Sequence, residues 1–300
     1  METLGGGAFF LPVVSGSGGA GKSAVSMMAA YAACAHGLRT ALVDCDLQFG
    51  DLHVLAGEES PLRMDEALAD LGKVADLAMS AHAPVLIAAP DRLEAAEEVA
   101  RRLPSLFAEL DRIFDVVVVN TGASWAEHHA VILESSSCAL FLVDQRSSSV
   151  RACRHALELC GRCGIATSSF VFVVNRCARG SLLTSLDVSC ALKGARVLEL
   201  RDGGSVVEEL LGAGLAGELA RARNDFVVSV NALLETVLPD RAQRAEARET
   251  LGVLASRPSR RFFGRRRLAG RGDADARPRR GAGALSAFNA GSESEAGARV

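Results

Sequence analysis

The sequence is short of lysine and of aromatic residues. Lys22, Lys73 and Lys193 are the only lysines among 33 basic residues, so arginine supplies almost all of the positive charge. Aromatic residues make up 5% of the 300 residues, with a single Trp and a single Tyr. A compact ammonium and a planar guanidinium bind anions differently. One of the three lysines lies inside a glycine-rich segment, which indicates a specific role for Lys22.

Long hydrophobic runs and a secretory leader are also missing. No apolar run reaches the roughly 18 residues of a membrane-spanning helix, and the residues before Phe9 lack a basic leader region. We therefore expect a cytoplasmic protein whose eight cysteines are reduced thiols. Cys160 and Cys163 form one isolated CxxC pair, for which we expect helix packing rather than metal or redox chemistry.

Charge is divided unevenly along the chain. Residues 241–300 contain 14 arginines and 6 acidic residues, a net charge of +8. Residues 1–240 contain 19 basic and 30 acidic residues, a net charge of −11. An acidic body with a basic tail predicts that any contact with an anionic polymer or membrane runs through the tail.

Short apolar runs alternate with helical patterns, which is typical of an α/β protein with a doubly wound, mainly parallel sheet. Continuous apolar runs such as Val116–Val119 fit strands that are buried on both faces. The predicted strands are Phe9–Ser15, Thr40–Asp44, Pro84–Ala89, Asp115–Asn120, Cys138–Val143, Phe170–Asn175 and Arg196–Leu200. The predicted helices are Lys22–His36, Arg92–Leu110, Val150–Cys163, Val206–Leu211 and Gly217–Val237.

Two parts of the chain are expected. Residues 1–239 form a nucleotide-binding domain, and residues 240–300 form a basic, largely disordered tail. Asp240–Thr250 has the composition of a further helix, whereas the segment from Gly270 onward lacks apolar periodicity.

A phosphate-binding loop is the strongest motif. Gly16-Ser17-Gly18-Gly19-Ala20-Gly21-Lys22-Ser23 satisfies the pattern G-x-x-x-x-G-K-[ST] between a predicted strand and a predicted helix. The glycines let backbone N–H groups surround phosphate oxygens, Lys22 reaches the β- and γ-phosphates, and Ser23 ligates Mg²⁺. The alternative is a glycine-rich turn with an accidental Gly-Lys-Ser. The setting favours binding of a purine nucleoside triphosphate, ATP.

Two carboxylates lie at the end of the second predicted strand. Asp44 and Asp46 are two residues apart and therefore point to the same side, next to the phosphate-binding loop. One is suited to orienting a water and the other to the Mg²⁺ shell, so Asp46 joins Lys22 as a candidate catalytic residue. The alternative is a strand-terminal turn with solvated aspartates.

These residues carry a family resemblance. Ser15–Ser23 resembles the deviant Walker A loop of the MinD/ParA ATPases, which have a three-layer P-loop NTPase fold. Residues 44–52, Asp-Cys-Asp-Leu-Gln-Phe-Gly-Asp-Leu, resemble more narrowly the CpaE/TadZ branch, which serves assembly of Tad/Flp pili. Similar segments continue over about residues 9–237, at Ala88–Pro90, Ile113–Asp115, Trp125, Val143–Gln145, Ser149–Arg151 and Val173–Arg176.

The resemblance implies roles for individual residues, and the sequence departs from the family pattern at two positions. It places the adenine-contacting Asn at Asn175, with Arg176 beside it. The signature lysine, which in the family reaches the partner's nucleotide across a dimer, is replaced by Ser17. Asn120 stands where the family has its Walker B aspartate, and its carbonyl oxygen is left to order a Mg²⁺-bound water. Lost charge at the transferring phosphoryl group predicts slow hydrolysis or none.

The basic tail contains one mixed segment. Residues 259–268, Ser-Arg-Arg-Phe-Phe-Gly-Arg-Arg-Arg-Leu, interleave apolar residues with five arginines. We expect either a solvated charge run or an anchor on an anionic membrane surface, as at the C-terminus of MinD relatives. Nucleic acid is a third, less favoured partner, since ParA relatives bind DNA non-specifically.

The sequence thus predicts a CpaE/TadZ-like ATP- and Mg²⁺-binding protein that forms an ATP-dependent homodimer. It would assist the pilus secretion machinery in the cytoplasm or at the inner face of the membrane. Two alternatives remain open at this point. One is an active ATPase that positions the division site or DNA, and the other is a non-catalytic dimeric scaffold.

Overall fold

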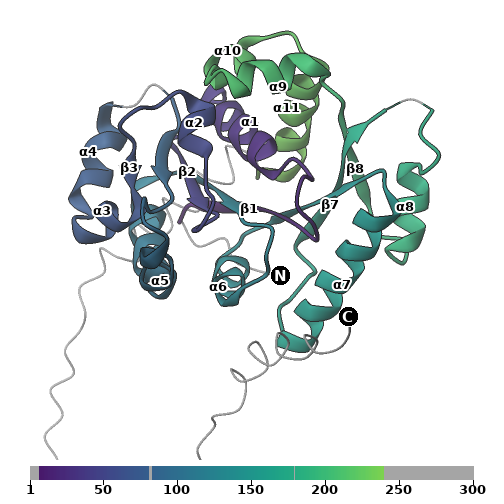
Figure 1. Ribbon diagram of the computed structural model, residues 1–300, viewed down its shortest axis with the longest axis horizontal. Helices are drawn as coiled ribbons and strands as arrows, with labels where there is room; N and C mark the ends of the chain where they lie inside the picture. The colour runs from purple at the N-terminus through teal and green to yellow at the C-terminus, as the bar shows by residue number, and fades with distance from the viewer. Residues whose placement is uncertain (1–6, 81–82, 179, 240–300) are drawn as a thin grey trace, which may run out of the picture.

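The computed structural model describes residues 7–80, 83–178 and 180–239 (Figure 1). The predicted helix Asp240–Thr250, the disordered tail and the basic segment 259–268 lie outside these residues, so they stay predictions. Within the described residues, no helix is both long and apolar enough to cross a membrane.

One parallel sheet forms the centre of the molecule. Its eight strands among the described residues follow the order β3-β4-β2-β5-β1-β6-β7-β8. They are β1 (Phe9–Ser15), β2 (Thr40–Cys45), β3 (Leu62–Arg63), β4 (Val85–Ala88), β5 (Val116–Thr121), β6 (Ala139–Asp144), β7 (Phe170–Cys177) and β8 (Val197–Arg201). Every pair is parallel. Because β1 lies between β5 and β6, the loop after it opens near the middle of the carboxyl edge.

Helices cover both faces of the sheet and give three layers (Figure 1). On one face lie α1 (Lys22–Ala35), α2 (Leu52–Ala56), α9 (Ser205–Gly212), α10 (Ala216–Arg221) and α11 (Asp225–Val237). On the other lie α3 (Met64–Ala69), α4 (Gly72–Ser80), α5 (Ala96–Ile113), α6 (Glu127–Glu134), α7 (Ser147–Cys163) and α8 (Ser185–Ala191), with the 3-10 turn η1 (Leu93–Ala95) before α5. The predicted three-layer α/β fold with a parallel sheet is confirmed.

Side-chain alternation along the central strands explains the layers. Leu11 and Val13 of β1 point into the cluster beneath α1, whereas Phe10 and Val14 point to the opposite face. All four are buried, so β1 is apolar on both sides. This double burial is why the strands read as continuous hydrophobic runs in the sequence.

All seven predicted strands are present: Phe9–Ser15 matches the prediction, and the ends of the other six differ by at most two residues. The two-residue edge strand β3 was not predicted, because Leu62–Arg63 is too short to show a pattern. Short helices were missed for the same reason, and these are α2, α3, α4, α6 and α8.

Two helix predictions need correction. The helix predicted over Gly217–Val237 is two helices, α10 and α11, separated at Asn224. The Asn224 side chain caps α11 by accepting a hydrogen bond from the Phe226 N–H at 2.9 Å, which starts a new helix there. The helical stretch predicted from Arg92 begins instead as the 3-10 turn η1 and becomes α-helical at Ala96.

Candidate functional site

The loop between β1 and α1 lies at the carboxyl edge of the sheet, where open parallel sheets bind ligands. Gly19 and Gly21 have φ angles of +72° and +90°, a region that L side chains rarely adopt. A Cβ atom on Gly21 would lie 2.3 Å from Asn175 Nδ2, and one on Gly16 would lie 2.3 Å from the backbone of Ala152. The path of the loop therefore requires glycine at these positions.

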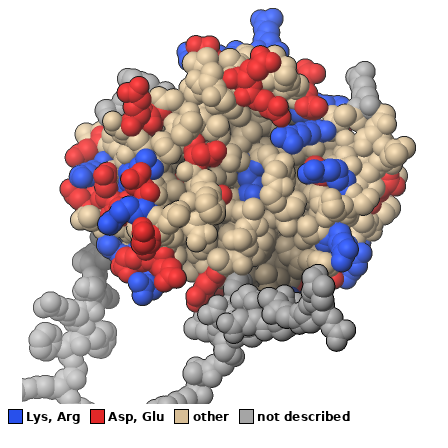
Figure 2. All heavy atoms as spheres, viewed as in Figure 1, with Lys and Arg blue, Asp and Glu red and all other residues tan. Residues whose placement is uncertain are grey.

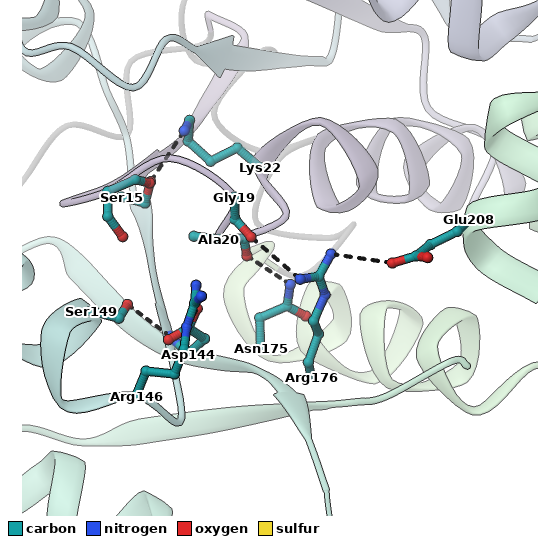
Figure 3. A network of polar contacts seen from close by, with 11 residues as sticks. Ser15, Gly19, Ala20, Lys22, Asp144, Arg146, Ser149, Asn175, Arg176 and Glu208 are labelled. Atoms are coloured by element: carbon teal, nitrogen blue, oxygen red, sulfur yellow. Dashed lines mark hydrogen bonds and ion pairs between the residues drawn. The ribbon is translucent and has the colours of Figure 1, made fainter. Parts of the chain in front are cut away.

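Lys22 begins α1 and turns its side chain back under the loop (Figure 3). Its Nζ donates a hydrogen bond to Ser15 Oγ at 3.2 Å, and Ser15 Oγ donates to the Ser17 carbonyl oxygen at 2.6 Å. The side chain is only 8% exposed, and this burial lowers the Lys22 pKa, while the Asp46 carboxylate opposes the shift. A desolvated ammonium in this position is suited to an anion.

Ser17 does not bring a charge to the loop. Its hydroxyl oxygen is buried and has no hydrogen-bond partner among the described residues. Gly18 and Gly19, which follow it, are exposed. The tip of the loop is therefore open while the Ser17 hydroxyl points inward.

Asp44 is completely buried at the end of β2. Its carboxylate accepts hydrogen bonds from Asn120 Nδ2 at 3.0 Å and from the backbone N–H groups of Leu52 and Asp46 at 3.1 and 3.3 Å. Burial raises the Asp44 pKa to about 6, although these donors oppose the rise. The Asn120 carbonyl oxygen in turn accepts from Ser26 Oγ at 3.4 Å. Both carboxylate oxygens of Asp44 thus accept backbone hydrogen bonds from the segment that follows β2, and these bonds hold that segment in place.

Asp46 is the carboxylate that reaches the loop. It is half-buried, and a Cβ atom on Gly122 would lie 3.0 Å from its Oδ1, so the segment after β5 approaches it closely. Its charge acts on Lys22 and on His128 of α6. Ser23 is half-buried in the first turn of α1, next to Lys22. The structure therefore brings Lys22, Ser23 and Asp46 together, whereas Asp44 and Asn120 lie in the protein interior behind them.

Asn175 and Arg176 tie the end of β7 to the same loop (Figure 3). Asn175 Nδ2 donates to the Ala20 carbonyl oxygen at 2.9 Å, and its Oδ1 is buried without a partner among the described residues. Arg176 has a left-handed backbone with φ of 56°. Its guanidinium donates to the Gly19 carbonyl oxygen at 3.4 Å and lies 3.9 Å from a carboxylate oxygen of Glu208 on α9. The predicted pair therefore contacts the loop directly.

Sequence reasoning gave no role to the residues around Trp125. The Trp125 indole Nε1 donates to the Ser15 carbonyl oxygen at 3.0 Å, and its ring stacks on His129 with centroids 5.4 Å apart. His129 is 1% exposed, and burial lowers its pKa to about 3. The signal in the sequence was a lone Trp followed by two histidines after a buried strand, which alone does not indicate a contact with the loop.

Asp144 was also missed as part of this region. It ends β6 opposite Asn175 in the strand register. Its Oδ2 accepts from Arg146 Nε at 2.8 Å, and its Oδ1 is buried without a partner among the described residues. Figure 3 shows it with its two partners, Arg146 and Ser149.

The residues present fit a nucleoside triphosphate with Mg²⁺. The buried Lys22 ammonium and the glycine-restricted loop supply donors for phosphates, and the unpaired Asn175 Oδ1 is an acceptor for an N–H group. Among the described residues, no cluster of three His, Cys, Asp or Glu side chains could hold a metal by itself. Mg²⁺ bound through few protein groups and phosphates needs no such cluster.

Known proteins share this domain and this fold. A profile of the CobQ/CobB/MinD/ParA nucleotide binding domain matches residues 11–198, which is more than half of the chain. No match was found among curated protein sequences.

Solved structures with the same fold include a ParA family ATPase from Chlorobium tepidum TLS, with a TM-score of 0.67 and 19% identity over 75% of this chain and 98% of that chain. MinD from Pyrococcus horikoshii OT3, in complex with Mg-ADP, has a TM-score of 0.62 and 17% identity over 83% and 99% of the two chains. McdA from Cyanothece without nucleotide has a TM-score of 0.61 and 17% identity over 76% and 99%. At these identities the likeness concerns the fold.

Proposed function

The chain belongs to the CobQ/CobB/MinD/ParA nucleotide-binding domain family, and we propose that it binds ATP with Mg²⁺ as a switching ligand and hydrolyses it slowly or not at all. One observation carries this proposal. The phosphate-binding loop keeps a buried lysine, Lys22, but has a neutral, inward-facing Ser17 at the position of the signature lysine of MinD/ParA ATPases.

We assign binding roles from the geometry of the loop. The backbone of Gly16–Gly21 and the Lys22 ammonium hold the phosphates. Ser23 and Asp46 would hold a hydrated Mg²⁺, which would neutralise phosphate charge. Asn175 and Arg176, which contact the carbonyl oxygens of Ala20 and Gly19, would lie at the side of the base.

Asp44 and Asn120 have a supporting role in this proposal. Their hydrogen bond holds the end of β2 against the end of β5, so that Asp46 stays next to Lys22. Both oxygens of Asp44 and the carbonyl oxygen of Asn120 already accept hydrogen bonds within the protein. This favours indirect support of the metal over direct ligation.

Slow hydrolysis follows from charge. In phosphoryl transfer, a cation placed at the transferring group contributes roughly 10³–10⁵ in rate. Ser17 has no charge, and Asn120 lacks the carboxylate expected at the end of β5. Lys22 and Asp46 remain, so binding is retained while the rate of the chemical step is reduced.

The finer assignment rests on residues 44–52, which resemble the CpaE/TadZ branch. On that basis we propose a homodimer, controlled by ATP occupancy, that assists localisation or assembly of Tad/Flp pilus machinery. Residues 259–268 would attach it to the inner, anionic face of the cell membrane.

A second candidate is an active ATPase that positions a cellular structure. The presence of Asp46 beside Lys22 favours it, because these two residues provide a water-orienting carboxylate and a phosphate-binding cation. The solved structures of similar fold include a septum site-determining MinD. The two candidates differ in the rate of ATP turnover.

The test measures binding and turnover separately on the full chain. ATP binding in the presence of Mg²⁺ is measured by calorimetry, and turnover by phosphate release. We expect binding that is lost in Lys22→Gln and kept in Lys193→Gln, which removes an exposed lysine instead. We expect turnover on the order of 10⁻² per second or slower. Turnover of about 1 per second or faster would support the positioning ATPase, and absence of ATP binding would exclude both candidates.

A further inference from the structure

A shallow groove of about 360 Å³ lies beside the edge strand β3. Its apolar lining comes from Pro61 and Leu62 at the strand and from Leu77 on α4. Leu77 is 41% exposed, whereas Pro61 and Leu62 are buried, so the apolar surface that the groove presents to solvent comes mainly from Leu77. It lies apart from the phosphate-binding loop, and nothing in the proposed function uses it.

The rim of the groove is acidic. Glu58, Glu66 and Asp76 border it, with Lys73 as the opposing charge. The segment 58–77 as a whole contains six acidic and two basic residues, a net charge of −4. Figure 2 shows carboxylates gathered on the side of the molecule that carries α3 to α5, interleaved with fewer cations.

One rim carboxylate is partly shielded from solvent. Glu58 is exposed as a residue, but partial burial of its carboxyl group raises its pKa. Arg63, one of the two basic residues of the segment, is engaged elsewhere, 3.4 Å from a carboxylate oxygen of Asp91. The groove therefore suits an occupant that combines cationic groups with apolar side chains.

We propose that this groove docks residues 259–268 of the same chain. This segment has five arginines together with Phe262, Phe263 and Leu268. Its arginines match the carboxylates of the rim, and its adjacent phenylalanines match the apolar lining. The body of the chain is acidic and this segment is the most basic run in the sequence, so their charges are complementary.

The connecting chain, residues 240–258, contains 19 residues. Residues 240–258 separate the last described residue, Pro239, from the segment. A flexible chain of this length has a root-mean-square span of about 25 Å and reaches about 60 Å when extended. Tethering raises the local concentration of the segment to the millimolar range, so that even weak docking is populated.

Docking in the groove would control whether residues 259–268 are free to bind an anionic surface. A segment held in the groove does not contact an anionic surface, and a membrane rich in anionic lipid competes for the same arginines. The inference goes beyond the proposed function, since docking requires neither ATP nor a membrane. The docking proposal can therefore be wrong while the proposed function is right, and the proposed function can be wrong while the docking proposal is right.

The experiment places a photoreactive p-benzoylphenylalanine at position 262 of the full chain. After irradiation at low salt, mass spectrometry locates the cross-link. We expect a product with the mass of one chain, joined within residues 58–77. The same photoreactive residue at position 288, in place of a phenylalanine outside the basic segment, is the matched control and should give no product in the groove.

Charge variants test the acidic rim. Glu58→Lys with Glu66→Lys should lower the yield at least about fivefold, because two attractive pairs become repulsive. Glu134→Lys with Glu158→Lys, which changes the same charge on α6 and α7, should leave it unchanged. If the first variant does not fold, Glu58→Gln with Glu66→Gln serves instead. Cross-links at other elements, between chains, or insensitive to the rim charges would overturn the proposal.

Discussion

Asn120 donates a hydrogen bond from Nδ2 to Asp44 Oδ1 at 3.0 Å, and both side chains are buried at the carboxyl edge of the sheet. A neutral amide at this position provides the donor that a buried carboxylate needs. The Ser26 hydroxyl donates a hydrogen bond to the Asn120 carbonyl oxygen, so both polar groups of this amide have partners. Asn120 is thus matched to Asp44 by hydrogen bonding, and its neutrality is part of that match.

Asn120→Asp should therefore destabilise the protein, although it restores the family's residue. Two buried carboxylates would face each other, and we expect a loss of about 2–4 kcal/mol at pH 7.5. The loss should be smaller at pH 5. The Asp44 pKa of about 6 lies above the ordinary 3.8, so the folded protein takes up a proton as the pH falls through this range. Urea unfolding at the two pH values measures the difference, and an unchanged midpoint at pH 7.5 would contradict it.

His129 should make the fold sensitive to mild acid. Its pKa of about 3 in the folded protein lies below the ordinary 6.5, so the unfolded chain binds more protons below pH 6.5. Stability from this group is present above pH 6.5 and decreases as the pH falls toward 3, by about 2 kcal/mol at pH 5.

The variant His129→Gln cannot titrate and should lose less stability between pH 7 and pH 5 than the wild type. Thermal unfolding at both values tests this. His36→Gln, at an exposed position, is the control and should follow the wild type. Equal pH dependence of all three proteins would show that His129 is not the group responsible.

Replacing Lys22 should separate stability from binding. Because burial disfavours the Lys22 ammonium, Lys22→Met should raise the stability of the nucleotide-free protein by about 1 kcal/mol. The same change removes a charged donor to phosphate and should weaken ATP binding at least about tenfold. Thermal unfolding without ATP and calorimetry with ATP provide the two readouts. A Lys22→Met protein that is less stable than the wild type and still binds ATP would contradict both expectations.

Ser17→Lys should increase ATP turnover. A lysine at this position adds the missing cation, and we expect a rise of at least about tenfold in phosphate release. Ser17→Met, of similar length without charge, is the matched control and should not rise. An increase in both variants would indicate an effect of size on the loop rather than an effect of charge.

Much of the fold could be predicted because its signals are long or chemically specific. Strands such as β5 are buried on both faces and therefore appear as unbroken apolar runs. The Gly-Lys-Ser sequence between an apolar run and a helical pattern located the loop and Lys22 correctly. Asn175 came from the family resemblance, and the structure places its side chain against the Ala20 carbonyl oxygen of the loop, while its contact with a base stays a prediction.

What could not be predicted depends on contacts between distant segments. The sequence gives Asp44 and Asp46 the same pattern, but only tertiary structure buries one against Asn120 and directs the other toward Lys22. The break at Asn224 depends on hydrogen bonds of its side chain with the Phe226 N–H and the Gly203 carbonyl oxygen, which compete with a continuous apolar pattern. The contact of Trp125 with Ser15 joins residues 110 positions apart.

That contact has a practical consequence. Trp125 is the only tryptophan in the chain, and its indole N–H donates a hydrogen bond to Ser15, the last residue of β1 and the one directly before the phosphate-binding loop. Its ring also stacks on His129. Intrinsic fluorescence excited at the indole therefore comes from one site, and a displaced loop or a charged imidazole changes its intensity. The protein carries its own optical reporter at the place where its ligand is expected to bind.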